Sequence, residues 1–293
     1  QNDVARLPEL FDPELSSSRS VEMLVKNAKK SVQELLSENY TVDRNGNVDI
    51  YRCLQQQLAN FSQIEWLSSH VLVDLITLEK DSARRADQYK KPTCLGAWIY
   101  HQDTGLLEPI LAKEVVLATG GLASLYPYST NDLYARGEGL GIALKHGIRT
   151  LPLTPKWSPL ALFEENRPLF PLPIEWLLEG GRLLVSKHGG SCPVEASPEK
   201  VLFQQMLSAH QTHIWLDVTM SDISSFKERF FTEDQYCLSR GFNIAKDLLP
   251  VAPAARDCVG GIVIDGVGQS SMQRLRALGA VAETGLSFRS QEP

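Results

Sequence analysis

A run of apolar residues that ends in two glycines constrains the fold of this chain more than any other feature of its sequence. Residues 115–118 read Val-Val-Leu-Ala, follow Glu114, and lead through Thr119 to Gly120 and Gly121. An unbroken apolar run is typical of a strand buried on both faces of a parallel sheet. Paired glycines at its end let the backbone approach a neighbour or a ligand closely. We therefore predict an α/β fold with a ligand-binding turn at 118–121; a tight turn without a ligand is the open alternative.

A second group of small residues lies a short way downstream. Ser129, Thr130 and Asn131 precede a predicted helix over 133–146, and Gly137-Glu138-Gly139 falls near the start of that helix. Helix N-termini present unpaired N–H donors, so this segment is a second candidate for ligand contact. Close packing against a neighbouring element explains the glycines equally well. No stretch has the G-x-G-x-x-G spacing of a dinucleotide fingerprint, which argues against a dehydrogenase that uses only a nicotinamide cofactor.

The composition narrows the class of protein and of partner. The 293 residues are 43% hydrophobic and 22% charged, as in folded globular proteins. The 29 basic and 35 acidic residues give a net charge of −6, and no dense basic block favours nucleic acid. We expect no metal site and no disulfide framework, because the five cysteines form no C-x-x-C pair, and we expect a reducing cytoplasm. Neither a run of about 18 apolar residues nor a secretory leader occurs, so no membrane partner is expected. Gln1 in place of Met suggests a trimmed or partial chain.

Hydrophobic periodicity predicts the order of elements. In the first half we expect helices from Val21 to near Asn39 and from Arg52, strands over 64–66 and 71–75, a loop over 80–91, and a hairpin of 94–101 with 106–111. Six prolines between 152 and 173 mark a crossing into a second domain. Beyond it we expect a helix over 199–210, a strand over 212–218, a helix within 221–240 that stops at Gly241, and a strand over 260–265.

Seven short strings occur in an order that resembles the L-aspartate oxidase family, within the succinate dehydrogenase and fumarate reductase flavoproteins. They are 73–77, 94–97, 115–121, 129–131, 137–139, 213–219, and 253–255 with Gly260 and Gly261. Each string is weak alone, and the resemblance depends on their common order, from Val21 onward.

The resemblance implies an FAD-binding, Rossmann-like domain that lacks its first βαβ unit and is interrupted by an α+β capping domain. The divisions would be 1–150, 151–250 and 251–293, the last truncated. The flavin would contact Ala118, Thr119, Gly120, Gly121, Ser129, Thr130, Asn131, Gly137, Glu138 and Gly139. The family reaction is the oxidation of L-aspartate to iminoaspartate by hydride transfer to FAD, and quinolinate synthase then uses the product in NAD synthesis.

The sequence departs from the family at several positions. The amino-terminal glycine fingerprint, a Gly-Gly-His-Ser stretch after Asp49 and a carboxy-terminal arginine have no counterpart. Four substitutions accompany these losses: Ser158 and Arg256 stand where the family has histidines, Glu199 where it has an arginine, and Ala280 where it has a glutamate. Glu175 is retained, although its preceding threonine is replaced by Ile174. A dicarboxylate substrate needs cationic partners, because burying an unpaired carboxylate is costly.

We therefore predict an FAD-dependent oxidoreductase by family whose own aspartate activity is impaired or absent, a pseudoenzyme, with Glu175 and Arg256 as candidate catalytic residues. Glu175 is equally well explained as an ordinary helix carboxylate. The alternative is a non-catalytic binding protein on a remnant flavoprotein scaffold, with quinolinate synthase or a full-length oxidase as partner. A changed substrate, held by Arg256 and Lys156, is a third hypothesis.

Overall fold

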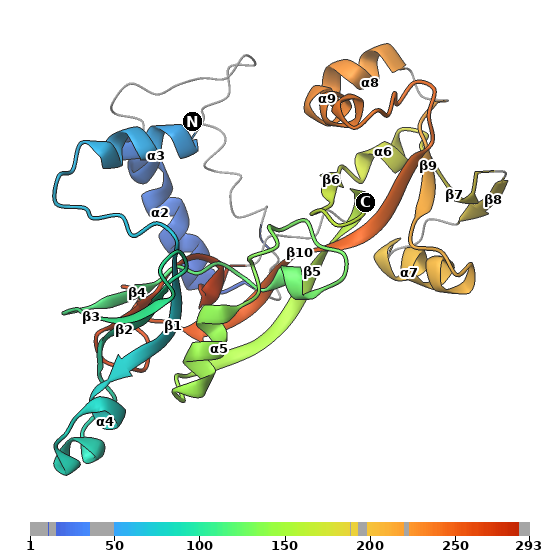
Figure 1. Cartoon of the computed structure of the whole chain (residues 1–293). Helices are drawn as coiled ribbons and strands as arrows, with labels where there is room; N and C mark the ends of the chain where they lie inside the picture. The colour runs from blue at the N-terminus through green and yellow to red at the C-terminus, as the bar shows by residue number, and fades with distance from the viewer. Residues whose placement is uncertain are drawn as a thin grey trace. The chain divides into compact units, whose positions relative to one another are not determined.

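The computed structural model describes residues 11, 16–35, 50–187, 189–192, 198–219 and 223–286 (Figure 1). Contacts divide the chain into two compact units. Unit 1 comprises Gln1–Val115, Met272–Arg276 and Thr284–Phe288, and unit 2 comprises Val116–Ser271, Ala277–Glu283 and Arg289–Pro293. The expected division into 1–150, 151–250 and 251–293 stays a prediction.

Two amphipathic helices open the described part of unit 1. They are α2 (Ser18–Leu35) and α3 (Ile50–Ala59). Both predicted helices are confirmed, and each lies where apolar residues recur at three- and four-residue steps. The expected end of the first helix near Asn39 lies outside the described residues.

An antiparallel three-stranded sheet follows these helices in unit 1. Its order is β1-β2-β3, made of β1 (His70–Thr77), β2 (Cys94–His101) and β3 (Leu106–Leu111). The predicted hairpin is confirmed, with Gly105 at a φ of 72° in its turn. The strand expected over 64–66 is wrong: this segment is irregular and Trp66 is 69% exposed. A three-residue segment does not make a strand without a partner for its backbone groups.

The polar segment over 80–91 is more ordered than the predicted loop. It holds α4 (Leu78–Asp81) and the 3₁₀ helix η2 (Arg85–Tyr89). Asp87 is buried, accepts a hydrogen bond from the Ser82 hydroxyl, and pairs with Lys90 at 2.7 Å. These contacts, which depend on spacing rather than hydrophobicity, lower the pKa of Asp87, the Lys90 hydrogen bond most of all.

The apolar run at 115–118 forms a shorter and more exposed strand than predicted. Strand β4 (Val115–Leu117) pairs with β11 (Leu275–Ala277) in a two-stranded sheet. Leu117 is buried, but Val116 is 48% exposed. The prediction of a strand buried on both faces is therefore wrong, because the face of β4 that carries Val116 is left largely uncovered.

A larger sheet is the centre of unit 2. Its strands run in the order β6-β5-β10-β9-β7-β8, and β12 pairs with β10. The bounds are β5 (Thr150–Leu162), β6 (Phe170–Leu172), β7 (Arg182–Ser186), β8 (Gly189–Cys192), β9 (Ile214–Asp217), β10 (Leu249–Val263) and β12 (Ala282–Glu283). The long strands β5 and β10 lie side by side along their length (Figure 1). The proline-rich segment therefore contains a strand that the composition did not indicate.

Prolines fit into β5 and β10 largely where their pairing is irregular. The register shifts between Ala252 and Ala254, which leaves Pro253 without a partner on β5. Another shift in the register lies between Val259 and Gly261, opposite Pro152 on β5. Such bulges tolerate a residue that lacks an N–H donor.

Helices pack around this sheet. They are α5 (Glu138–Lys145), α6 (Glu175–Leu178), α7 (Pro198–Ser208), α8 (Ile223–Arg229) and α9 (Phe231–Ser239), with η3 (Ala123–Leu125) and η4 (Gly279–Val281). The helix expected over 199–210 is confirmed, and the one within 221–240 is divided into α8 and α9. Helix α5 begins at Glu138, because Gly137 adopts a φ of 76° just before it, rather than at 133. None of the helices in the described segments combines the length and apolar character needed to cross a membrane.

Candidate functional site

The turn after β4 lies against the first turn of α5. Gly137 N–H donates to Gly121 O at 3.1 Å. A Cβ on Gly139 would lie 2.1 Å from Thr119 Oγ1, so only glycine permits this approach. Thr119 Oγ1 is itself buried and has no hydrogen-bond partner among the described residues. The predicted segments 118–121 and 137–139 therefore meet, and the buried Thr119 hydroxyl between them has no hydrogen-bond partner among the described residues.

The predicted segment 129–131 is hydrogen-bonded to β10. Ser129 forms a parallel bridge with Ala255, and Ala255 N–H donates to Tyr128 O at 2.8 Å. Thr130 N–H donates to Ala255 O at 2.9 Å, and Asn131 Nδ2 donates to Arg256 O. Main-chain hydrogen bonds thus hold Asn131 next to Arg256, although the two residues are far apart in the sequence.

Arg256 is the extra residue of a β-bulge. Ala255 pairs with Trp157 and Asp257 pairs with Lys156, which leaves Arg256 without a partner on β5. The bulge frees the Arg256 carbonyl that Asn131 binds, and bulges re-aim the side chains they carry. Within the described residues the Arg256 guanidinium makes no ion pair. It is therefore available to an anionic group.

Asp257 also belongs to this assembly, although no pattern in the sequence points to it. A Cβ on Gly121 would lie 3.9 Å from Asp257 Oδ1 and 3.5 Å from Ala280 Cβ. Asp257 Oδ1 accepts from Cys258 N–H at 2.7 Å. Gly121 and Gly137, the bulge, and Ala280 thus lie in one neighbourhood of unit 2.

Glu175 occupies a different environment. It is the first residue of α6, and its Oε2 is buried without a hydrogen-bond partner in the described chain. Its neighbour Trp176 is fully buried against Phe226 and Phe230, with ring centroids 5.0 and 5.9 Å away. No hydrogen bond or ion pair joins Glu175 to Arg256 among the described residues, so the structure does not bring the two predicted catalytic residues into contact.

Ser158 and Glu199 offer no cation to a ligand. Ser158 is 6% exposed and donates its hydroxyl proton to Leu160 O at 2.9 Å within β5. Glu199 lies in the first turn of α7, where a negative charge favours the helix dipole. Both residues therefore have an ordinary structural role here.

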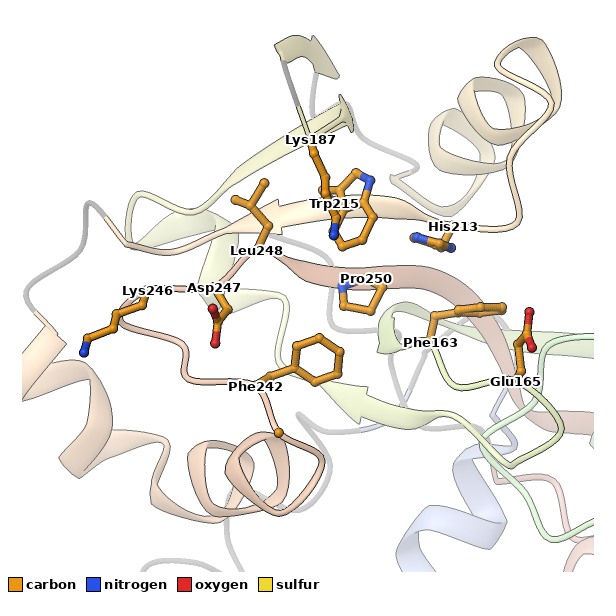
Figure 2. Close-up of a pocket in the computed structure, with 11 residues that line it drawn as sticks. Phe163, Glu165, Lys187, His213, Trp215, Phe242, Lys246, Asp247, Leu248 and Pro250 are labelled. Atoms are coloured by element: carbon orange, nitrogen blue, oxygen red, sulfur yellow. The ribbon is translucent and has the colours of Figure 1, made fainter.

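A separate pocket of about 630 Å³ lies beside β9 and β10 (Figure 2). Its lining includes Phe163, Glu165, Lys187, His213, Trp215, Gly241, Phe242, Lys246, Asp247, Leu248 and Pro250, and none of the predicted site residues belongs to it. Its residues come from four distant segments of the sequence. The alternation of His213 and Trp215 in the predicted strand was the one local sequence signal for this pocket.

Stacked rings define one wall of this pocket. Phe163 stacks on His213 at a centroid distance of 5.0 Å, and His213 meets the Trp215 edge at 4.8 Å. Lys187 Nζ lies 4.3 Å above the Trp215 ring (Figure 2). Burial, together with the nearby Lys187 ammonium, lowers the pKa of His213, while Glu165 opposes the shift. The neutral form of His213 is therefore favoured, and the rings of Phe163, His213 and Trp215 give this wall an aromatic surface.

Comparison with known proteins identifies relatives over most of the chain. The model of the family described as FAD binding domain matches residues 41–291. A curated L-aspartate oxidase of Clostridium perfringens is 29% identical over 91% of this chain and 64% of its own length. A second one, of Yersinia pestis, is 26% identical over 93% of this chain and 57% of its own length. The chain therefore spans less than two thirds of these relatives.

Solved structures share the fold. An E. coli quinol fumarate reductase chain superposes with a TM-score of 0.67 at 21% identity, covering 93% of this chain and 53% of that one. The Mycobacterium smegmatis Sdh1 complex gives 0.70 at 17% identity, covering 98% and 54%. These neighbours have the same mixed α/β architecture. The α/β part of the predicted fold class is therefore confirmed.

Proposed function

Because the chain belongs to the family of FAD binding domains, we propose that it is the flavin-contacting part of an L-aspartate oxidase-like oxidoreductase whose activity on L-aspartate is impaired. The observation that carries this proposal is the meeting of the 118–121 turn, the 129–131 segment and the start of α5 near the Arg256 bulge of β10. In this proposal the smaller strands β6 to β9, with α6 to α9, correspond to the capping domain.

The residues around Thr119 fit a flavin. Thr119 Oγ1 is a buried donor without a partner in the described chain, and flavin rings carry acceptor atoms along one edge. Gly120 has a φ of 76°, and a Cβ there would meet nothing within 4 Å, so its backbone borders open space. We assign Ala118 to Gly121, Ser129 to Asn131 and Gly137 to Gly139 as the flavin-contacting residues. FAD, when bound, would supply the hydride acceptor.

The charges around the bulge explain why L-aspartate would be a poor substrate. Two substrate carboxylates need two cationic partners, and in our proposal Arg256 holds one of them. Ser158 is neutral and internally bonded, and Glu199 carries a negative charge. Glu175, the second proposed catalytic residue, would attract the substrate ammonium group. Loss of one charged partner commonly lowers a rate about 10²-fold or more.

The test compares two glycines of α5. Gly139→Ala should weaken FAD binding at least about tenfold, because the new Cβ displaces Thr119, whereas Gly141→Ala should not, because a Cβ there meets nothing within 4 Å. Quenching of flavin fluorescence on titration with protein measures both affinities. The FAD-loaded protein should release little hydrogen peroxide with L-aspartate. Equal FAD affinities in the two variants would contradict the assigned turn, and rapid aspartate-dependent peroxide release would contradict the impairment.

Failure to take up FAD at all would favour the second candidate function, a non-catalytic binding protein. The pocket beside Trp215 supports that candidate, because it is built without any of the predicted flavin or catalytic residues. Quinolinate synthase and a full-length oxidase are the proposed protein partners in that case.

A further inference from the structure

Two histidines of unit 1 face each other across the β1–β2 pair. His70 and His101 are direct partners in the antiparallel register, so their side chains project from the same face of the sheet. Their ring centroids are 4.4 Å apart, with the ring planes inclined by 44°. Both residues are partly exposed, so solvent reaches the pair.

Hydrogen bonds at Nδ1 orient both rings. His70 Nδ1 lies 2.6 Å from Ser68 O, and a carbonyl only accepts, so Nδ1 carries the proton and Nε2 of the neutral ring has a free lone pair. His101 Nδ1 lies 2.5 Å from Thr104 Oγ1. The Thr104 hydroxyl can accept, which allows His101 the same tautomer. Metal-binding histidines in proteins are held in this way, with the second ring nitrogen donating to an oxygen.

The backbone around the pair is fixed by its own contacts. Ser69, between Ser68 and His70, adopts a φ of 59°, and its carbonyl accepts from Gln102 N–H at 2.8 Å. His101 O accepts from Gly105 N–H at 2.8 Å in the turn that presents Thr104. The Ser68 carbonyl is therefore presented by the backbone just before β1, and the Thr104 hydroxyl by the turn between β2 and β3.

We propose that His70 and His101 form a surface site for a divalent transition metal ion of the zinc, copper or nickel class, bound by Nε2 of both rings. Metal–nitrogen distances of about 2.0–2.1 Å require the two nitrogens to be about 3 Å apart, and the centroids of the two rings are 4.4 Å apart. No group of three or more His, Cys, Asp or Glu that could hold a metal occurs among the described residues. Water therefore completes the coordination, and Cu²⁺ binds more tightly than Zn²⁺.

The site is independent of the proposed flavin function, because it uses none of the residues assigned to FAD. It also differs from ordinary cross-strand packing of two rings, which needs no particular tautomer. Packing alone predicts independent, weak metal binding at each imidazole, whereas a shared ion predicts that loss of either ring removes the chelate.

The experiment titrates the full chain, stripped with a chelator, with CuCl₂ and ZnCl₂ at pH 7.5 in a calorimeter. His70→Gln and His101→Gln should each weaken the tightest site about tenfold or more, and the double variant should be no weaker than either. His213→Gln, which changes a histidine of unit 2, should leave this affinity unchanged.

A measurement on the unchanged protein removes any ambiguity from misfolded variants. Zn²⁺ should protect both His70 and His101 from carbethoxylation, read by peptide mass spectrometry, while His213 is unaffected. Protection of only one of the two rings, additive losses in the double variant, or an affinity that neither substitution changes would overturn the proposal.

Discussion

Trp176→Ala is expected to lower the free energy of unfolding by about 3–5 kcal/mol, the range for removing a large buried aromatic side chain. Trp176 is fully buried and is among the largest such side chains in the core of unit 2. Its ring contacts Phe226 and Phe230 edge-on, so it joins α6 to α8 and to the segment before α9. Alanine would leave a cavity that these rings fill only in part.

Two controls separate packing from other effects. Trp176 Nε1 has no hydrogen-bond partner in the described residues, so Trp176→Phe removes an unsatisfied donor and should cost clearly less than alanine. Trp66→Ala, at a residue 69% exposed, should change stability by less than about 0.5 kcal/mol. Urea unfolding followed by circular dichroism measures all three variants. Equal losses at Trp176 and Trp66 would contradict the core described for unit 2.

Elements with strong local patterns were predictable from the sequence. The apolar stripe of α2 and the hairpin of β2 and β3 depend on residues a few positions apart. The start of α2 was predicted close to Ser18, and the hairpin strands were predicted with their observed bounds. The stop at Gly241 follows from its φ of 84°, which glycine adopts without strain. In each case the signal and the structure lie in the same short segment.

Strand pairing was not predictable in the same way. Six prolines between 152 and 173 indicated a crossing, yet β5 occupies Thr150–Leu162, because bulges opposite β10 accommodate Pro152 and Pro159. Conversely, Trp66 and its neighbours have strand-forming composition but no strand to pair with. Whether a segment becomes a strand depends on a partner that a local pattern does not reveal.

The same reason limits what the sequence reveals about the site. The order of the short strings indicated which segments mattered, and the turn, the 129–131 segment and the start of α5 do come together. The bulge at Arg256 and the proximity of Asp257 were not foreseeable, because both arise from the register of β10 against β5. The pairing of His70 with His101 likewise arises only from the register of β1 against β2, although both residues are visible in the sequence.

Gly260→Ala should destabilise the protein by at least about 3 kcal/mol, since it combines backbone strain with a steric clash. Gly260 adopts a φ of 111°, a conformation that residues with a Cβ rarely adopt. A Cβ there would lie 2.2 Å from Pro152 O and 2.9 Å from Pro152 C, both backbone atoms of β5. Because backbone cannot rotate away as a side chain can, β5 and β10 would have to separate at this point.

Gly266→Ala is the matched control for Gly260→Ala. Gly266 lies three residues after the end of β10, its φ is not in the left-handed region, and a Cβ would meet nothing within 4 Å. There the substitution should be neutral or stabilise by about 0.4–1 kcal/mol, because alanine has less conformational freedom in the unfolded chain. The urea midpoints of the two variants, measured under the same conditions, give the difference in their stability. Equal midpoints would mean that β10 does not approach Pro152 as closely as described, and the register that isolates Arg256 in its bulge would then be in error as well.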